Sequence, residues 1–228
     1  MSSNEARRGA NLTIREREHG RPPSCASSRA ITAPASMDAP EWMFRDETYC
    51  LVTQMVEHEE DSTVLSSAIS ALGHLDDPKA IPLIIRYEDH SDENVRIAVA
   101  FALGCFPNDE QSVRTLLKLT SDGHAVVRDW AVFGLGVLGD ADSPDIREGL
   151  LRCLEDADED VREEAAVGLG KRHDQRLLPR LWAMLDAPEL KTRVAEAAVA
   201  LLGLDSDPPK WVAADYKTAL VSKFQISD

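Results

Sequence analysis

Small and apolar residues recur along this chain with a helical period inside a longer repeat. Five segments begin with valine and end nine residues later with glycine: 64–73, 95–104, 127–136, 161–170 and 194–203. Their glycines are 31, 32, 34 and 33 residues apart. Counted from the valine, small or apolar residues fall at positions +4, +5 and +8, which share one face of an α-helix. The pattern predicts five copies of one helical unit.

Each unit continues with a turn and a second helix. The turns are rich in aspartate, asparagine and proline, as in 76–78 and 107–109, and the second helices have their own apolar face, as at Leu116 and Leu150. One helical pair cannot bury both of its faces, so such units occur in stacked arrays. We therefore expect a continuous stack between residues 46 and 224, with a capping helix at each end.

Local signals mark where the first helix of a unit begins and ends. Asp92 and Asp158 stand just before two of the repeat valines and are predicted to cap the helices that follow. The terminal glycine of each unit is predicted to take the left-handed conformation at the helix C-terminus, as at Gly136.

The strings VRIAVAFALG, VRDWAVFGLG and VREEAAVGLG resemble the HEAT-like repeat named after phycobilisome lyases, and the resemblance covers about three quarters of the chain. It implies an all-α fold, a right-handed α-α superhelix of the HEAT/armadillo-like solenoid class with about five helical pairs. It also implies that the arginine after the valine joins a ladder of polar contacts along the stack. Arg96, Arg128 and Arg162 match that position, whereas the first and last units lack it.

Charge divides the chain into two parts. Residues 1–36 contain six arginines and three glutamates, and since the whole chain carries −15, the remaining residues carry −18. The same leader is rich in serine, proline and alanine. We expect residues 1–40 to be a disordered basic leader and residues 41–228 to be the repeat domain. The alternatives are an organelle transit peptide, which three glutamates disfavour, and a true start of translation at Met37.

Several classes of function are disfavoured by composition. The sequence has no apolar stretch of the roughly 18 residues that span a bilayer, and its four cysteines have no metal-ligand spacing. An acidic body disfavours binding to nucleic acid and to anionic membranes. We therefore expect a cytoplasmic protein with no metal and no cofactor; its oligomeric state is not predicted by these patterns.

Enzyme families with similar repeats leave one alternative. A di-iron site of the deoxyhypusine hydroxylase type needs several His-Glu pairs, and this chain has one, His58-Glu59. HEAT-like DNA glycosylases need a basic groove, which an acidic body does not favour. No phosphate-binding loop or nucleophile elbow is present either. A phycobilin lyase, or a lyase-like subunit handling a tetrapyrrole, remains the alternative to a protein with no catalytic residues.

Three cations are predicted to form a basic stripe. Arg86, Lys118 and Arg152 each lie nine residues before a repeat valine, on the side of the second helix that faces away from its apolar positions. Arg114 and Arg147 lie on the same helices and would widen the stripe. We expect second helices to line the concave surface, where the stripe would attract an acidic partner. The alternative is that these are ordinary solvated residues.

Trp130 is the other candidate for a binding residue. It stands three residues after its repeat valine, where the other units have small or charged residues. A partly exposed tryptophan is typical of a binding hot spot, and the alternative is that it fills a gap against the neighbouring repeat. Taken together, the sequence predicts a non-enzymatic module that binds another protein on its concave surface, as an adaptor, assembly factor, scaffold or immunity-type inhibitor.

Overall fold

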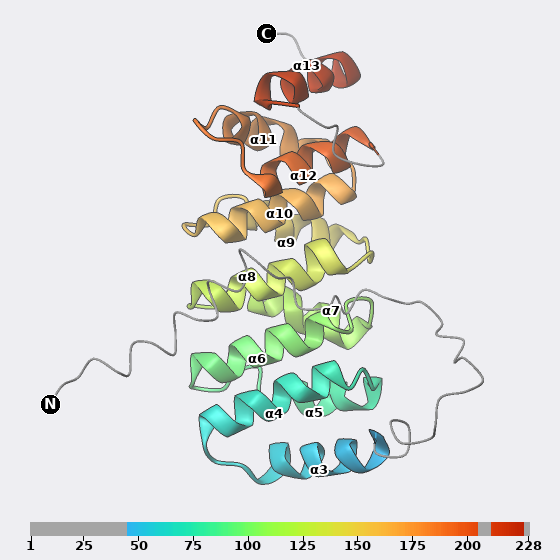
Figure 1. The fold of residues 1–228 in the computed structure, drawn as a ribbon, viewed down its shortest axis with the longest axis vertical. Coiled ribbons are helices and arrows are strands. Elements are labelled where there is room, and N and C mark those ends of the chain that lie inside the picture. Colours follow the sequence, from blue (N-terminus) through green and yellow to red (C-terminus); the bar gives the residue numbers. More distant parts are fainter. Residues whose placement is uncertain (1–44, 205–210, 226–228) are drawn as a thin grey trace, which may run out of the picture. The chain divides into compact units, whose positions relative to one another are not determined.

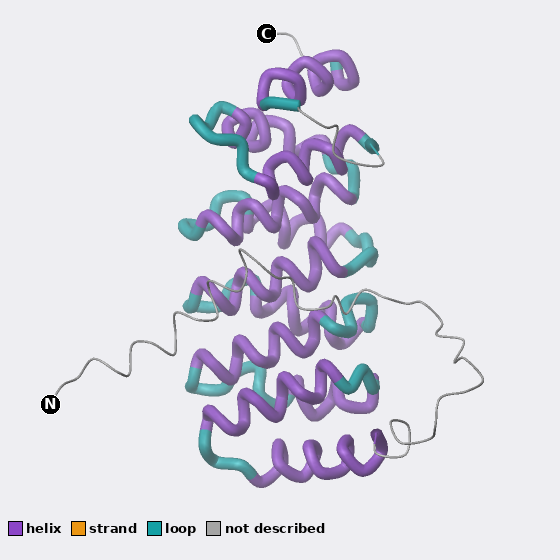
Figure 2. The backbone as a smooth tube through the Cα atoms, viewed as in Figure 1, coloured by secondary structure: helices purple, strands orange, loops and turns teal. Residues whose placement is uncertain are grey.

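The computed structural model describes residues 45–204 and 211–225, and all regular structure in these ranges is helical (Figures 1 and 2). The predicted leader, residues 1–40, lies outside the described residues. The helices follow one another along the stack in sequence order, from α3 to α13 (Figure 1). The prediction of an all-α solenoid is confirmed.

The five predicted first helices lie side by side in one layer (Figure 1). They are α4 (Ser62–His74), α6 (Glu93–Gly104), α8 (Ala125–Phe133), α10 (Glu159–Lys171) and α12 (Thr192–Leu202). The second helices pack against them and are α5 (Ile81–Ile85), α7 (Glu110–Leu119), α9 (Pro144–Cys153), α11 (Leu178–Leu185) and α13 (Ala213–Phe224). The remaining elements are α3 (Arg45–His58) at one end, the 3-10 turns η1 (Pro78–Ala80) and η3 (Gln175–Leu177), and the π-helical turn η2 (Gly134–Leu138).

Aspartate side chains begin several of these helices. Asp92 accepts a hydrogen bond from the amide of Asn94, and Asp158 accepts from the amides of Asp160 and Val161. Both predicted caps are confirmed. Each such cap stabilises its helix by about 1 kcal/mol, because it satisfies an amide that has no partner within the helix.

The apolar interior is continuous from one end of the stack to the other. Its fully buried side chains include Ile69, Leu103, Leu116, Leu150, Leu181 and Leu220. Val113 and Leu117 of α7 contact both the N-terminal and the C-terminal parts of this interior. The units therefore share one core, as a tandem array requires.

The repeat glycines serve helix packing, which differs from the prediction. Only Gly203 has a positive φ, at 67°, so the left-handed conformation was predicted wrongly for the other four: Gly73, Gly104, Gly136 and Gly170. A Cβ added at Gly136 would lie 3.1 Å from the Cα of Gly168 on the next first helix. Glycine is needed there because two helix backbones approach each other, not because φ is unusual.

Helical geometry explains which residues meet. Positions +9 and +7 from the repeat valine lie on opposite flanks of a helix, so the +9 glycine of one unit meets the +7 residue of the next. The observed contacts pair Gly73 with Ala102, Gly104 with Gly134, and Gly136 with Gly168. Gly170 departs from this rule, because a Cβ there would lie 2.6 Å from the carbonyl oxygen of Ala197, three residues after Val194. Gly203 is the left-handed C-cap of α12, as predicted for that unit.

Candidate functional site

The predicted basic stripe lies on the second helices. Arg86 at the C-terminal end of α5, Lys118 on α7 and Arg152 on α9 are all exposed. The Lys118 ammonium lies 2.9 Å from Glu88 Oε1 and 2.5 Å from Asp89 Oδ2. Hydrogen bonds to Asp89 and then to Glu88 raise the pKa of Lys118. Two carboxylates of the preceding repeat therefore offset the charge in the middle of the stripe.

The two residues expected to widen the stripe are also engaged. Arg114 lies 2.7 Å from Glu110 in an exposed i,i+4 pair on α7. Arg147 is 2.6 Å from Asp142 and 3.3 Å from Asp174, and so ties together the turn before α9 and the turn after α10. Arg147 thus has a structural task, and the stripe is narrower than the sequence suggested.

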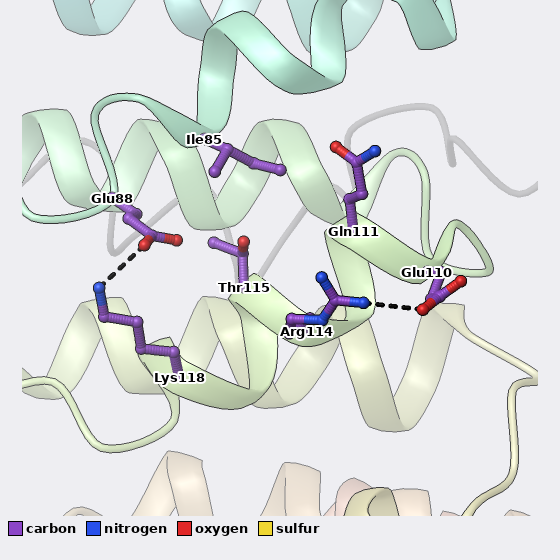
Figure 3. Close-up of a pocket in the computed structure, with 7 residues that line it drawn as sticks. All are labelled: Ile85, Glu88, Glu110, Gln111, Arg114, Thr115 and Lys118. Atoms are coloured by element: carbon purple, nitrogen blue, oxygen red, sulfur yellow. Dashed lines mark hydrogen bonds and ion pairs between the residues drawn. The ribbon is translucent and has the colours of Figure 1, made fainter.

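A hollow of about 430 Å³ lies between α5 and α7 on this layer (Figure 3). Its lining consists of Ile85, Glu88, Glu110, Gln111, Arg114, Thr115 and Lys118. Glu88 is paired with Lys118, and Glu110 with Arg114, so the charges of the lining cancel (Figure 3). A charged ligand would have to break these ion pairs, which makes the hollow a poor candidate for a ligand site.

The arginine ladder implied by the family resemblance is present. Arg96 bonds both carboxylate oxygens of Asp122, at 2.7 and 3.1 Å. Arg128 bonds both oxygens of Asp156, at 2.7 Å each, and donates to the Asp122 carbonyl at 2.9 Å. Arg162 donates to the carbonyl of Asp156 at 2.7 Å. Arg96 and Arg128 each join one inter-repeat turn to the next and so stabilise the stacking of repeats, whereas the bonds of Arg162 stay within the turn before α10.

Asp174 holds a second polar link. The Arg176 guanidinium donates to its carboxylate at 2.9 and 2.6 Å, and Arg147 donates at 3.3 Å. These bonds, with those of Arg176 the most important, lower the pKa of Asp174 to about 2. Because this pKa lies below the ordinary value of 3.8, the ionised carboxylate stabilises the fold above about pH 4. The contribution is lost as the pH falls from about 4 to about 2.

We expect Asp174→Asn to lower the free energy of unfolding by about 2 kcal/mol at neutral pH. Asparagine keeps an oxygen for the cap of η3, so the change tests the charge. Urea denaturation at several pH values should show the gap between wild type and variant closing near pH 2. Asp140→Asn, at an exposed carboxylate nearby, is the control and should cost less than about 0.5 kcal/mol. A gap of constant size across this pH range would contradict the assignment.

Trp130 lies on the first-helix layer, away from the basic stripe. Its half-buried ring meets the ring of Phe101 on α6 edge-on, with centroids 5.2 Å apart, and that of Phe133 at 5.8 Å. His74 of α4 contacts Phe101 at 5.1 Å. These four rings, named here the aromatic row, cross three successive first helices. Their positions, +3, +6 and +10 from a repeat valine, face away from the second helices.

Carboxylates lie beside one end of the aromatic row. Arg193 of α12 has its guanidinium 5.7 Å from the centre of the Phe133 ring, and it bonds Glu164 at 3.0 Å and Glu196 at 2.7 Å. A neighbouring cation, Lys191, pairs with Glu159 and Glu163 at 2.6 and 2.9 Å. Burial raises the pKa of Glu163. Asp129 also acts electrostatically on Arg193. Asp129, Glu163 and Glu164 are buried, Glu196 is half-buried and Glu159 is exposed; these five carboxylates are named here the acidic flank.

Sequence reasoning found Trp130 but missed its neighbours. Phe101 and Phe133 both stand at position +6, where α4 has Ser70 and α10 has Val167. Two aromatic residues at the same outward position of adjacent units could have been recognised from the sequence as a candidate surface. The contact of Arg193 with Phe133 could not be predicted, because it joins residues of two different units.

The two helix layers differ in how closely successive units pack. The glycine contacts bring the backbones of successive first helices together, whereas successive second helices pack less closely. The assignment of the second helices to the concave surface stays a prediction.

No group of three or more histidine, cysteine or acidic side chains within residues 45–204 and 211–225 could hold a metal ion. His58 and Glu59 lie at the end of α3. None of the helices described is long and apolar enough to cross a bilayer.

Comparison with known proteins agrees with the fold. The chain is 30% identical over 159 residues to protein YibA of Escherichia coli strain K12. The aligned region covers 67% of this chain and 56% of YibA. The chain thus spans little more than half the length of this relative. A crystal structure of YibA superposes with a TM-score of 0.62 at 24% identity, covering 81% of this chain and 71% of that one. An engineered protein superposes with a TM-score of 0.56 at 17% identity, covering 78% and 85%.

A family model supplies the assignment. The model for HEAT repeats matches residues 51–136 and 113–203, which together span most of the described stack. It describes HEAT repeats in general, so the narrower likeness to phycobilisome-lyase repeats stays a resemblance. This chain belongs to the HEAT repeat family.

Proposed function

We propose that this chain is a non-enzymatic protein-binding module, a scaffold or adaptor, and that the aromatic row is the centre of its binding surface. Trp130 carries the proposal: it is a large ring, half buried, on the outward side of α8, and it bridges two repeats. Tryptophan is enriched among the residues that dominate binding energy. A rigid aromatic platform also loses little conformational entropy when a partner binds.

The fold supports the same function. The interior of the stack is apolar and continuous, which leaves the faces of the two helix layers for interactions. The basic stripe of Arg86, Lys118 and Arg152 is the competing surface, weakened by the ion pairs of Lys118.

Affinity capture with matched variants tests this function. Trp130→Ala should weaken capture of a specific partner by about 30-fold, the loss typical of a hot spot. The triple change Arg86→Glu, Lys118→Glu and Arg152→Glu should leave capture unchanged, with circular dichroism confirming that both variants stay helical. Loss of capture only in the triple variant would move the binding surface to the second helices. Stoichiometric uptake of a bilin with a spectral shift would instead favour the phycobilin lyase.

The thiols are consistent with a proposed cytoplasmic location. Cys50 and Cys153 are free thiols in the structure. Burial raises the pKa of Cys153 to about 11, so its thiol stays protonated and unreactive at neutral pH. A reducing compartment suits a chain with such unpaired thiols.

A further inference from the structure

The two end helices of the stack differ in the polarity of their exposed sides. Along α13, the exposed residues include Asp215, Thr218 and Ser222. Along α3, Leu51 and Met55 have exposed fractions of 62% and 45%. A terminal unit of a repeat stack normally presents a polar face to solvent, because no further unit covers it. The α3 end therefore has an apolar patch where a polar one is expected.

The register of α3 shows which way this patch faces. The buried residues of α7 and α9 lie 15, 12, 11 and 8 residues before the repeat valine that follows each helix. The buried and half-buried residues of α3 lie at the same distances before Val64, and they are Tyr49, Val52, Thr53 and Val56. Helix α3 thus has the register of a second helix and packs on α4 as one.

In this register, Leu51 and Met55 of α3 correspond to Arg114 and Lys118 of α7. Those two cations line the hollow between α7 and the preceding second helix, α5 (Figure 3). The corresponding positions of α9 also carry two charged residues. The patch is therefore on the side where a second helix meets its predecessor, and α3 is the first helix in the part of the chain that the structure describes (Figure 1).

The sequence before α3 does not encode another repeat helix. A first helix placed about one repeat length before Val64 would contain Pro34 and Pro40. A proline inside a helix costs about 3 kcal/mol, so this segment does not suit a helix of that kind. Three large apolar residues stand directly before α3 instead, and they are Trp42, Met43 and Phe44.

These three residues are within reach of the patch. An extended chain advances about 3.3 Å per residue, so Trp42 is able to lie about 10 Å from Arg45, where α3 begins. Along the helix, at 1.5 Å per residue, Leu51 is about 9 Å from Arg45. A segment of the same chain also has an effective concentration in the millimolar range. Two copies of the chain would each carry −15 and repel one another.

We infer that residues 40–44 fold back across α3 and cover Leu51 and Met55, with the ring of Trp42 against Leu51. This segment closes the α3 end of the stack and prevents a second copy of the chain from packing there. None of these residues belongs to the aromatic row. The closing contact is thus independent of the proposed binding of a partner at Trp130.

Acrylamide quenching of Trp42 in the full-length chain tests the contact. The emission of Trp42 is obtained by subtracting the signal of Trp42→Phe from that of the same chain with Trp42. We expect Trp42 to be quenched severalfold less than tryptophan in a short unstructured peptide. The double change Leu51→Ser and Met55→Ser should remove most of this protection, with circular dichroism showing that the chain stays helical. Val212→Ser, at an exposed apolar residue beside α13, is the control and should leave Trp42 protected.

Equal quenching of Trp42 with and without Leu51 and Met55 would overturn the contact, because the ring would then lie elsewhere. Sedimentation velocity tests the second part. The wild type is expected to be a monomer, and Trp42→Ser is expected to form dimers that the double serine change dissociates. If Trp42→Ser stays monomeric, the segment does not exclude a second copy. A wild-type dimer that the double change dissociates, with Trp42 freely quenched, would show that a second copy covers α3 in place of residues 40–44.

Discussion

Replacing Gly168 with valine is expected to destabilise the stack by about 3 kcal/mol or more. A Cβ at this position would lie 2.6 Å from the Cα of Gly136 and 3.3 Å from its carbonyl carbon. These are backbone atoms, which cannot rotate away as a flexible side chain would. The π-helical turn η2 and helix α10 would have to separate, and the contact of Gly168 with Leu150 would be lost or strained.

Thermal and urea denaturation followed by circular dichroism would measure this loss. Gly123→Val is the control, because no atom lies within 4 Å of a Cβ at that exposed loop position, and it should change stability by less than about 0.5 kcal/mol. If Gly168→Val melted at the same temperature as the wild type, η2 and α10 would not be in backbone contact.

A second substitution distinguishes two explanations for the repeat glycines, a left-handed C-cap and close helix packing. In Gly136→Val the added side chain enters the same contact from the other side, where the atom nearest to the Cβ is 3.1 Å away, so a smaller loss of stability is expected. A left-handed C-cap would predict damage at Gly136 and none at Gly168, which is not the last glycine of its unit. Greater damage at Gly168 than at Gly136 therefore supports close packing of helices.

Periodicity alone was sufficient to predict the fold. The spacing of valine and glycine reflects the stacking of one unit on the next, so five similar segments implied five first helices. The reason given for the glycines was nevertheless wrong, because a glycine near a helix end satisfies both a C-cap rule and a packing rule. Only the neighbouring helix decides between them, and its distance is not contained in a local pattern.

The candidate site was harder to predict for a related reason. The outward orientation of Arg86, Lys118 and Arg152 followed from helical geometry, and all three are exposed. Their ion pairs did not follow, because Glu88 and Asp89 reach Lys118 from the preceding unit. Trp130 was noticed as unusual for its position, but its role in a row depends on contacts between helices. Contacts within one helix can be predicted from residue spacing, whereas contacts between units are known only from the structure.

Arg172 supports the least regular part of the stack. Its side chain is only 8% exposed, and its guanidinium donates to five backbone carbonyls, those of Leu135, Gly136, Gly139, Ala141 and Gly168. Three of these belong to η2 or to the residue that follows it. Burial lowers the pKa of Arg172, but an arginine begins from so high a value that the cation persists at neutral pH. The cation thus satisfies carbonyls that a π-helical turn leaves without partners.

Arg172→Met is therefore expected to cost on the order of 4 kcal/mol, since several buried carbonyls would lose their only charged donor. The stability of Arg172→Lys should fall between that of the wild type and that of Arg172→Met, because one ammonium cannot reach five oxygens in different directions. Arg152→Met, at an exposed arginine of α9, should change stability by less than about 0.5 kcal/mol. Hydrogen exchange would locate the effect, with the amide of Gly139, which bonds the Gly134 carbonyl at 3.0 Å, losing protection early. Unchanged protection of that amide in Arg172→Met would show that η2 holds its conformation without the arginine.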